Sequence, residues 1–261
     1  MPVIDADGCP LWVEVEGPVR APALMLSNSL GTTLHMWDAQ VAAFAQRFHV
    51  VRYDRRGHGK SGVPDGPYTM ERLGRDALAI ADGLGLATFN WCGLSMGGME
   101  GQWLGAHAPA RIGRLVLANT SSHFAEPRIW NEGIAAIRAS GLGALSDRIL
   151  GLWFSPAFRA RAPARVAPMA AMLADTPAQG YIGCCAAIRD MDHRDLLARI
   201  SAPTLIIAGR LDQATPLAAA QFIHSRIAGA ALTVLEAAHI SNVEEPRAFA
   251  DAVLGFLTRA A

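Results

Sequence analysis

The sequence predicts an α/β fold, in which a mostly parallel central sheet is flanked by helices and carries an inserted helical cap. Three observations support this prediction. Short apolar runs rich in β-formers alternate with helix-like stretches along most of the chain. Several of these runs are apolar on both faces, as buried parallel strands require. One long segment, residues 121–197, breaks the alternation and contains no convincing strand.

Each expected element is a short stretch with a clear local pattern. The predicted strands are residues 11–15, 23–26, 49–53, 89–92, 115–118, 205–208 and 231–235. The predicted helices between them include residues 70–84, 99–108 and 218–227. Within the strandless segment, we expect several helices separated at Pro156, Pro163, Pro168 and Pro177. The chain is therefore expected to form a core, residues 1–120 and 198–261, and a cap, residues 121–197, over the ligand-binding edge of the sheet.

Composition narrows the classes of partner. The chain has 261 residues, of which 51% are hydrophobic and 18% charged, and this excludes a disordered chain. Lys+Arg and Asp+Glu both number 23, so there is no basic excess with which to bind nucleic acid. The N-terminus lacks a basic segment typical of a signal peptide, and no apolar run reaches about 18 residues. We expect no membrane partner and a cytoplasmic location.

The cysteines indicate a reducing compartment and no metal site. They are Cys9, Cys92, Cys184 and Cys185. No pair of C-x-x-C motifs is present, so the spacing does not predict a zinc site. Two of the four are adjacent, which is a poor framework for disulfides.

The motif G-x-S-x-G at residues 93–97 is the strongest chemical signal. It follows an expected strand and precedes an expected helix, which is the context of a nucleophilic serine on a strained turn. The small residues on either side let backbone segments approach closely, so that the Ser95 hydroxyl is exposed in a cleft. The alternative is a glycine-rich structural turn in which Ser95 is incidental.

A nucleophilic serine needs a base, because its hydroxyl is barely ionised at neutral pH. Asp212 follows the strand at residues 205–208, and His239 lies on the loop after the strand at residues 231–235. The order Ser95, Asp212, His239 is typical of a serine triad on this kind of sheet. Asp212 could instead be a turn residue that binds its own backbone.

Of the eight histidines, only His58 is a further candidate for the base. It lies in a glycine-rich loop before Ser95, and we expect it to order that loop. The others lie on no late strand-end loop, and we expect them on the surface or in the core: His35, His49, His107, His123, His193 and His224.

Acyl transfer also needs donors for the developing oxyanion. We expect one to be the backbone N–H of Met96, and the second to come from the loop at residues 28–32. Leu30 N–H is the first choice there and Ser29 the next. The composition of this loop also fits a plain turn.

Several segments together resemble the α/β-hydrolase superfamily, over nearly the whole chain. They are GLSMGG at 93–98, YDRRGHGKS at 53–61 and the Ala-His pair at 238–239. More narrowly, the chain resembles the 3-oxoadipate enol-lactonases of the β-ketoadipate pathway. That resemblance is carried by SNSLGTT at 27–33, LANT at 117–120 and YIGCCAAIRDMD at 181–192. Related enol-lactonases often have a small or polar residue where Arg55 stands, and the sequence alone assigns no chemical consequence to this difference.

The resemblance implies an α/β-hydrolase fold, a serine triad, no cofactor and no metal. It also implies a small anionic substrate, a five-membered enol-lactone with a carboxymethyl arm, which is opened to 3-oxoadipate during aromatic catabolism. A buried carboxylate needs a cation or polar donors. Among the cap arginines we favour Arg138, with Arg189 second. Trp130 and Trp153 are expected to wall the pocket, although both could simply pack the cap.

Two other classes of function remain open. A general carboxylesterase or a carbon–carbon bond hydrolase would keep the same triad. A non-hydrolytic small-molecule binder would keep the fold without turnover. The filled triad positions favour an enzyme over the binder.

Overall fold

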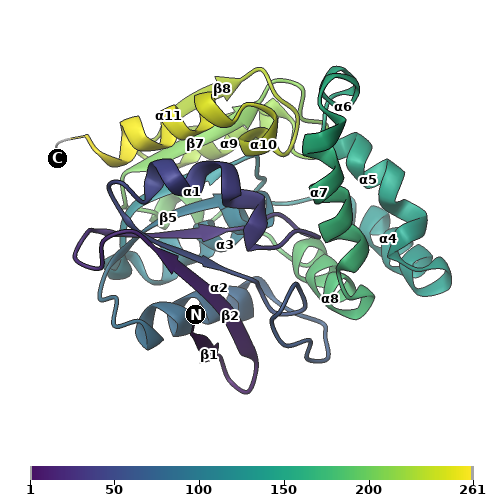
Figure 1. The fold of residues 1–261 in the computed structure, drawn as a ribbon, viewed down its shortest axis with the longest axis horizontal. Coiled ribbons are helices and arrows are strands. Elements are labelled where there is room, and N and C mark those ends of the chain that lie inside the picture. The colour runs from purple at the N-terminus through teal and green to yellow at the C-terminus, as the bar shows by residue number, and fades with distance from the viewer. Residues whose placement is uncertain (1, 260–261) are drawn as a thin grey trace.

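The structure is a computed structural model that describes residues 2–259. Its centre is an eight-stranded sheet with the order β1-β2-β4-β3-β5-β6-β7-β8 (Figure 1). The strands are β1 (Val3–Asp5), β2 (Pro10–Glu16), β3 (Ala23–Ser27), β4 (His49–Tyr53), β5 (Phe89–Leu94), β6 (Ile112–Ala118), β7 (Thr204–Gly209) and β8 (Ala231–Leu235). All neighbours from β4 to β8 pair in parallel. The mostly parallel α/β architecture predicted from the sequence is thus confirmed.

One edge of the sheet is antiparallel, within the mostly parallel architecture that the sequence predicts. β2 pairs antiparallel with both β1 and β4. Along β2, Leu11 and Val13 are buried while their neighbours are partly exposed, an alternation typical of a strand with one solvated face. β1 was not predicted, because a strand of three residues has too little pattern to be recognised.

Helices cover both faces of the sheet (Figure 1). The core helices are α1 (Asp38–Phe44), α2 (Met70–Gly83), α3 (Met96–His107), α9 (Leu217–Arg226), α10 (Ser241–Glu244) and α11 (Pro246–Leu257). α1 and α11 share one apolar cluster, in which the rings of Trp37 and Phe249 lie 5.9 Å apart. α2 and α9 contribute Ile80 and Ile223 to a second cluster. α1, α10 and α11 were not predicted, and α3 begins at Met96, three residues earlier than expected.

Five α-helices lie between β6 and β7 and gather beside one end of the sheet (Figure 1). They are α4 (Pro127–Ser140), α5 (Ser146–Trp153), α6 (Pro156–Arg161), α7 (Pro163–Asp175) and α8 (Ala178–Arg189). Two short 3-10 helices, Leu142–Leu145 and Leu197–Arg199, lie in the same part of the chain. Pro156 and Pro163 each begin a helix, and Pro177 precedes α8. The expectation for Pro168 is wrong, because it lies inside α7. No helix within residues 2–259 is long and apolar enough to cross a membrane.

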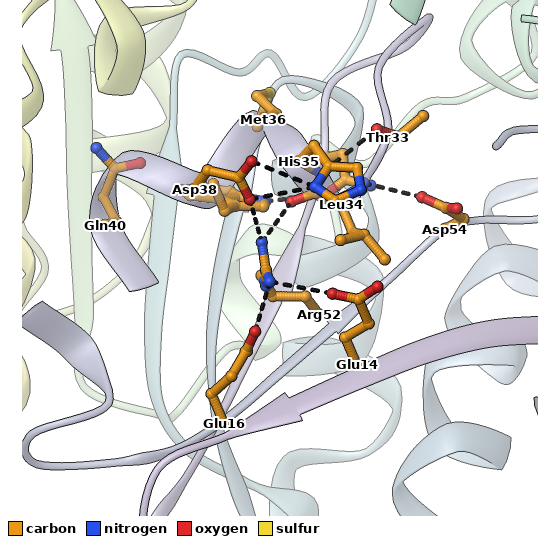
Figure 2. Close-up of polar contacts among 12 residues, drawn as sticks. Glu14, Glu16, Thr33, Leu34, His35, Met36, Asp38, Gln40, Arg52 and Asp54 are labelled. Atoms are coloured by element: carbon orange, nitrogen blue, oxygen red, sulfur yellow. Dashed lines mark hydrogen bonds and ion pairs between the residues drawn. The ribbon is translucent and has the colours of Figure 1, made fainter. Parts of the chain in front are cut away.

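A buried arginine joins the antiparallel edge to the segment before α1 (Figure 2). Arg52 of β4 donates to Glu16 and Asp38 at 2.5 Å each and to Glu14 at 3.2 Å. Asp54, the residue directly after β4, accepts the Leu34 N–H at 2.8 Å. These contacts fix the chain that follows the loop at residues 28–32.

Candidate active site

Ser95 occupies a strained turn between β5 and α3. Its backbone has φ 58° and ψ −114°, a conformation that non-glycine residues rarely adopt. The flanking glycines are sterically required, because a Cβ on Gly93 would lie 2.0 Å from the Gly97 carbonyl oxygen, and one on Gly97 would lie 2.3 Å from the Ser27 carbonyl oxygen. The turn directs Ser95 toward the residues that follow β7 and β8.

The structure brings Ser95, Asp212 and His239 together. The Ser95 Oγ lies 2.8 Å from His239 Nε2, and His239 Nδ1 lies 2.9 Å from Asp212 Oδ2. All three residues are at least nine-tenths buried, with exposures of 7%, 4% and 3% for Ser95, Asp212 and His239. Both ring nitrogens of His239 thus have a partner, in the geometry that general-base activation of a serine needs.

Asp212 is held as a carboxylate by a dense set of donors. Its Oδ1 accepts the N–H groups of Ala214 and Thr215 at 2.9 Å each. Its Oδ2 accepts the Thr215 hydroxyl at 2.8 Å and the Asn119 side-chain amide at 3.0 Å. Burial alone would raise the pKa of Asp212, but His239 and these hydrogen bonds hold the pKa below its usual value.

Asn119 and Thr215 are functional candidates that the sequence analysis did not single out. Asn119 follows β6 with φ 44°, and its amide donates to both Asp212 and the Ala238 carbonyl, the latter at 3.2 Å. Its side-chain oxygen accepts the Ser241 hydroxyl at 2.5 Å. An asparagine directly after a strand was the available signal, because asparagine tolerates this left-handed backbone.

The loop at residues 28–32 faces the serine, and Ser29 and Leu30 line the same cavity as Ser95. Within residues 2–259, the backbone N–H groups of Leu30 and Met96 donate to no protein acceptor. The Ser29 N–H likewise donates to no protein acceptor within these residues, so it stays the second candidate, and the Ser29 carbonyl accepts the Thr32 hydroxyl at 2.8 Å. Two unused N–H groups beside a buried serine are what an oxyanion hole needs.

His58 has a different place from the triad histidine. Its Nε2 accepts the Gly31 N–H at 3.0 Å, so it holds the loop at residues 28–32 from behind. Burial and the nearby Arg55 lower the pKa of His58 to about 3. A neutral imidazole is the form that can accept this bond.

A cavity of about 460 Å³ opens above Ser95 and His239 and extends under the cap. Trp130 and Trp153 both line it, as expected. Each also packs the cap: Trp130 stacks edge-on against Phe124 at 5.3 Å, and Trp153 belongs to the main apolar cluster.

The expected positions of Arg138 and Arg189 are wrong. Both line a separate cavity of about 920 Å³ and do not line the cavity at Ser95. On α4, Trp130, Gly133 and Ile137 face the serine cavity, whereas Arg138 lies one residue further and hence about 100° around the helix. Arg189 of α8 is engaged by Asp190 at 2.7 Å and by Asn131 at 3.0 Å.

Arg148 of α5 is the arginine that lines the serine cavity. Within residues 2–259 it forms no hydrogen bond or ion pair, although Glu126 lines the same cavity. Spacing along α5 was the available signal, because Leu145, Ile149 and Leu152 line the cavity beside it.

Comparison with known proteins places this geometry among hydrolases. The profile of the family described as "alpha/beta hydrolase fold" matches residues 22–144. The chain is 42% identical to 3-oxoadipate enol-lactonase 2 of Acinetobacter baylyi over 243 residues, which are 93% of this chain and 91% of that protein. It is 39% identical to 3-oxoadipate enol-lactonase 1 of the same organism over 255 residues, 98% of this chain and 96% of that protein.

Among solved structures, the enol-lactonase from Burkholderia xenovorans LB400 is similar over the entire fold. The TM-score is 0.97 at 41% sequence identity, covering 99% of this chain and 100% of that one. The likeness therefore includes the cap as well as the sheet.

Proposed function

The chain belongs to the 3-oxoadipate enol-lactonases of the α/β-hydrolase family, and from this premise we propose that it opens 3-oxoadipate enol-lactone to 3-oxoadipate through an acyl-enzyme on Ser95. The resemblance inferred from the sequence motifs is confirmed by these relatives. The observation that carries the proposed mechanism is the continuous contact from Ser95 Oγ through His239 to Asp212, at 2.8 Å and 2.9 Å.

In the first half of the reaction, His239 Nε2 takes the Ser95 proton as Oγ attacks the lactone carbonyl carbon. Asp212 orients the ring and stabilises the imidazolium. The N–H groups of Leu30 and Met96 donate to the oxyanion of the tetrahedral intermediate. The ring C–O bond then breaks, and the leaving enolate oxygen takes the proton from His239 to give an enol.

The second half releases the product. The leaving group stays attached to the acyl chain, so it can attack again and close the ring. Tautomerisation of the enol to the ketone removes that attacking oxygen and favours the forward reaction. Water, deprotonated by His239, then attacks the acyl carbon, and Ser95 leaves with the proton from His239.

Arg148 is the cap residue that we propose for the carboxylate of the substrate. It lines the serine cavity without a protein partner, so its guanidinium is available to a carboxylate that would otherwise be buried at a large energetic cost. Trp130 and Trp153 limit the width of the same cavity. This assignment replaces Arg138 and Arg189.

The decisive experiment is an ultraviolet assay of enol-lactone loss beside hydrolysis of neutral p-nitrophenyl esters. We expect a higher kcat/KM for the anionic lactone. Ser95→Ala should reduce both activities to below about one hundredth of wild type while the far-ultraviolet spectrum stays unchanged. Residual activity above that level would contradict the acyl-enzyme mechanism, and a preference for neutral esters would favour the general carboxylesterase.

We extend the proposal to the place of action. We propose that the reaction belongs to aromatic catabolism, as the resemblance to the enol-lactonases implies. We also propose that the protein is cytoplasmic. Support comes from the four cysteines, which are all free and buried thiols, including the adjacent pair Cys184 and Cys185.

A further inference from the structure

Arg55 and Glu100 form a buried ion pair behind Ser95 that the reaction as described does not use. Both side chains are 1% exposed, and Nη1 lies 3.2 Å from Oε1, without the alignment of a hydrogen bond. A buried ion pair of this kind contributes little net stability, because removing both charges from water is costly.

The second nitrogen of Arg55 reaches the loop that carries Leu30. Nη2 donates to the Asn28 carbonyl oxygen through a short hydrogen bond, and to Ser27 Oγ at 3.3 Å. The same Asn28 carbonyl accepts the Gly97 N–H at 3.1 Å. One carbonyl thus joins the guanidinium, the loop and the turn of the nucleophile.

Glu100 fixes the position of Arg55 from α3, the helix that begins directly after Ser95. Its Oε2 accepts the Ser27 hydroxyl at 2.5 Å and the Tyr53 hydroxyl at 2.9 Å. Burial raises the pKa of Glu100, and the Arg55 charge with these two hydroxyls opposes that rise. The pair therefore connects β3, β4 and α3 at one point below the catalytic turn.

Asn28 attaches the loop that carries Leu30 to the turn of the nucleophile, through the bond from the Gly97 N–H to its carbonyl. The Asn28 side chain is held by the Trp37 indole and the Tyr53 carbonyl, each at 2.9 Å. Gly31, on the other side of Leu30, is held by His58 at 3.0 Å.

The Leu30 N–H belongs to the same planar peptide as the Ser29 carbonyl, which accepts the Thr32 N–H at 3.3 Å and the Thr32 hydroxyl at 2.8 Å. Because this peptide is fixed within the loop, the place of its N–H relative to Ser95 depends on where the loop meets the turn of the nucleophile. That junction is the Asn28 carbonyl, which accepts from both Arg55 and Gly97.

We infer that Arg55, held in place by Glu100, is a positioning residue that fixes the loop carrying the Leu30 N–H against the turn of Ser95. This inference rests on the proposed acyl-transfer function, because only a reaction through a tetrahedral oxyanion needs that N–H.

The test is the double variant Arg55→Met with Glu100→Gln, which removes both charges while leaving an acceptor for Ser27 and Tyr53. Loss of a complete oxyanion donor lowers kcat by about 10²–10³-fold. A misdirected donor should lower kcat by about 10- to 100-fold, with KM changed by less than about threefold. Affinity for a trifluoromethyl ketone, which forms a tetrahedral adduct with Ser95, should fall in parallel with kcat.

Arg52→Met is the matched control. Arg52 is also a buried arginine of the same region, 6% exposed on its side chain, but its acidic partners Glu14, Glu16 and Asp38 reach solvent and none of them touches Asn28. We expect it to lower thermal stability and to leave kcat unchanged. Equal kcat losses in the control and the double variant would overturn the inference, as would a double variant with wild-type kcat.

If the double variant does not fold, Arg55→Lys decides the question. A single ammonium group opposite Glu100 cannot also serve the Asn28 carbonyl as the forked guanidinium does. We expect a kcat loss of about 3- to 10-fold. A wild-type kcat in Arg55→Lys would overturn the inference.

Both the enol-lactone and p-nitrophenyl acetate are used as substrates, because the oxyanion is common to both. Equal fold losses on the two substrates support the positioning role. If the wild-type protein does not open the lactone, the proposed function fails, and the acetate data still test the role of Arg55.

Discussion

Ser95 and Asn119 both have a left-handed backbone, with φ of 58° and 44°, and they follow adjacent parallel strands. Such conformations persist only where surrounding contacts over-determine them. Ser95 N–H donates to the Ala118 carbonyl at 2.8 Å, and the Thr120 hydroxyl donates to the Ser95 carbonyl at 2.8 Å. Asn119 N–H donates to the Ile207 carbonyl at 2.8 Å. Of the three non-glycine residues with positive φ within residues 2–259, two are thus the nucleophile and the residue that holds Asp212, and the third is Asp7.

The proposed contact between Arg148 and the carboxylate of the substrate predicts what happens when this single side chain is removed. Arg148→Ala should raise KM for the enol-lactone by about 10-fold or more, since a charge-assisted hydrogen bond contributes about 1.5–3 kcal/mol. Activity on neutral p-nitrophenyl acetate should change by less than about twofold. The measurement is steady-state kinetics on both substrates.

Arg138→Ala is the control for this prediction, because Arg138 belongs to the same cap and lines the other cavity. We expect wild-type KM on both substrates. If Arg138→Ala raised the lactone KM and Arg148→Ala did not, the assignment of the carboxylate to Arg148 would be refuted.

Between elements, the cap is hydrogen-bonded directly to the loop that carries His239. The Ile240 N–H donates to the Trp153 carbonyl at 3.0 Å. The Glu244 carboxyl group accepts the N–H of Ser155 and that of Ala238, each at 3.2 Å, and also the Ser155 hydroxyl. The start of α6 and the histidine loop therefore share one acceptor.

Ser155→Ala should accordingly lower both stability and turnover. The variant removes the N-terminal cap of α6, which binds Phe158 N–H, and leaves a buried carboxyl oxygen without its donor. The expected loss is about 1–3 kcal/mol of unfolding free energy. Turnover should fall by several-fold, because Glu244 also holds Ala238 next to His239. Urea unfolding and kcat are the measurements.

Thr69→Ala separates the two effects. Thr69 caps α2 by accepting the Arg72 N–H at 3.1 Å, and it is exposed and remote from His239. It should lose about 1 kcal/mol with kcat unchanged. If Ser155→Ala likewise kept its kcat, the proposed link between cap and histidine would not affect catalysis.

For the whole molecule, two buried histidines make stability depend on pH. Burial lowers the pKa of His58 to about 3 and that of His193 to about 4. In the unfolded chain both would titrate near 6.5. Below that pH the unfolded state binds protons that the folded state does not, so their contribution is complete above about pH 6.5 and is lost as pH falls toward 3 and 4, respectively.

His58→Gln tests this dependence, because a glutamine oxygen can still accept the Gly31 N–H but does not titrate. Each buried histidine adds a slope of up to about 1.4 kcal/mol per pH unit to the unfolding free energy. The variant should therefore show a shallower fall between about pH 6.5 and pH 5 in urea unfolding. An unchanged slope would show that His58 takes up its proton in the folded state.

The elements that the sequence identified are those with strong local signals. The parallel strands are buried apolar runs, so their side chains alone mark them. The edge strand β1, with three residues, and the helix α1, with seven, are too short to show such a pattern, and their contacts with neighbouring elements define them in the structure. At Pro168 the local signal is misleading, because a proline usually ends a helix and here it lies inside α7. Burial of Met169 and Leu173 in the apolar cluster outweighs the backbone hydrogen bond that a proline cannot donate.

By itself, the sequence determined the type of sheet, the turn at Ser95, and the candidates Asp212 and His239, because each follows from residue types next to a strand. Only the tertiary structure decided which arginine faces the serine and what Arg55 touches. Arg138 and Arg148 are both arginines of the expected cap, and the sequence does not distinguish them. Which cavity each one lines follows from the face of its helix and from how that helix packs. Arg55 meets Glu100 and Asn28 because two strands and a helix converge there, and no spacing along the chain records that convergence.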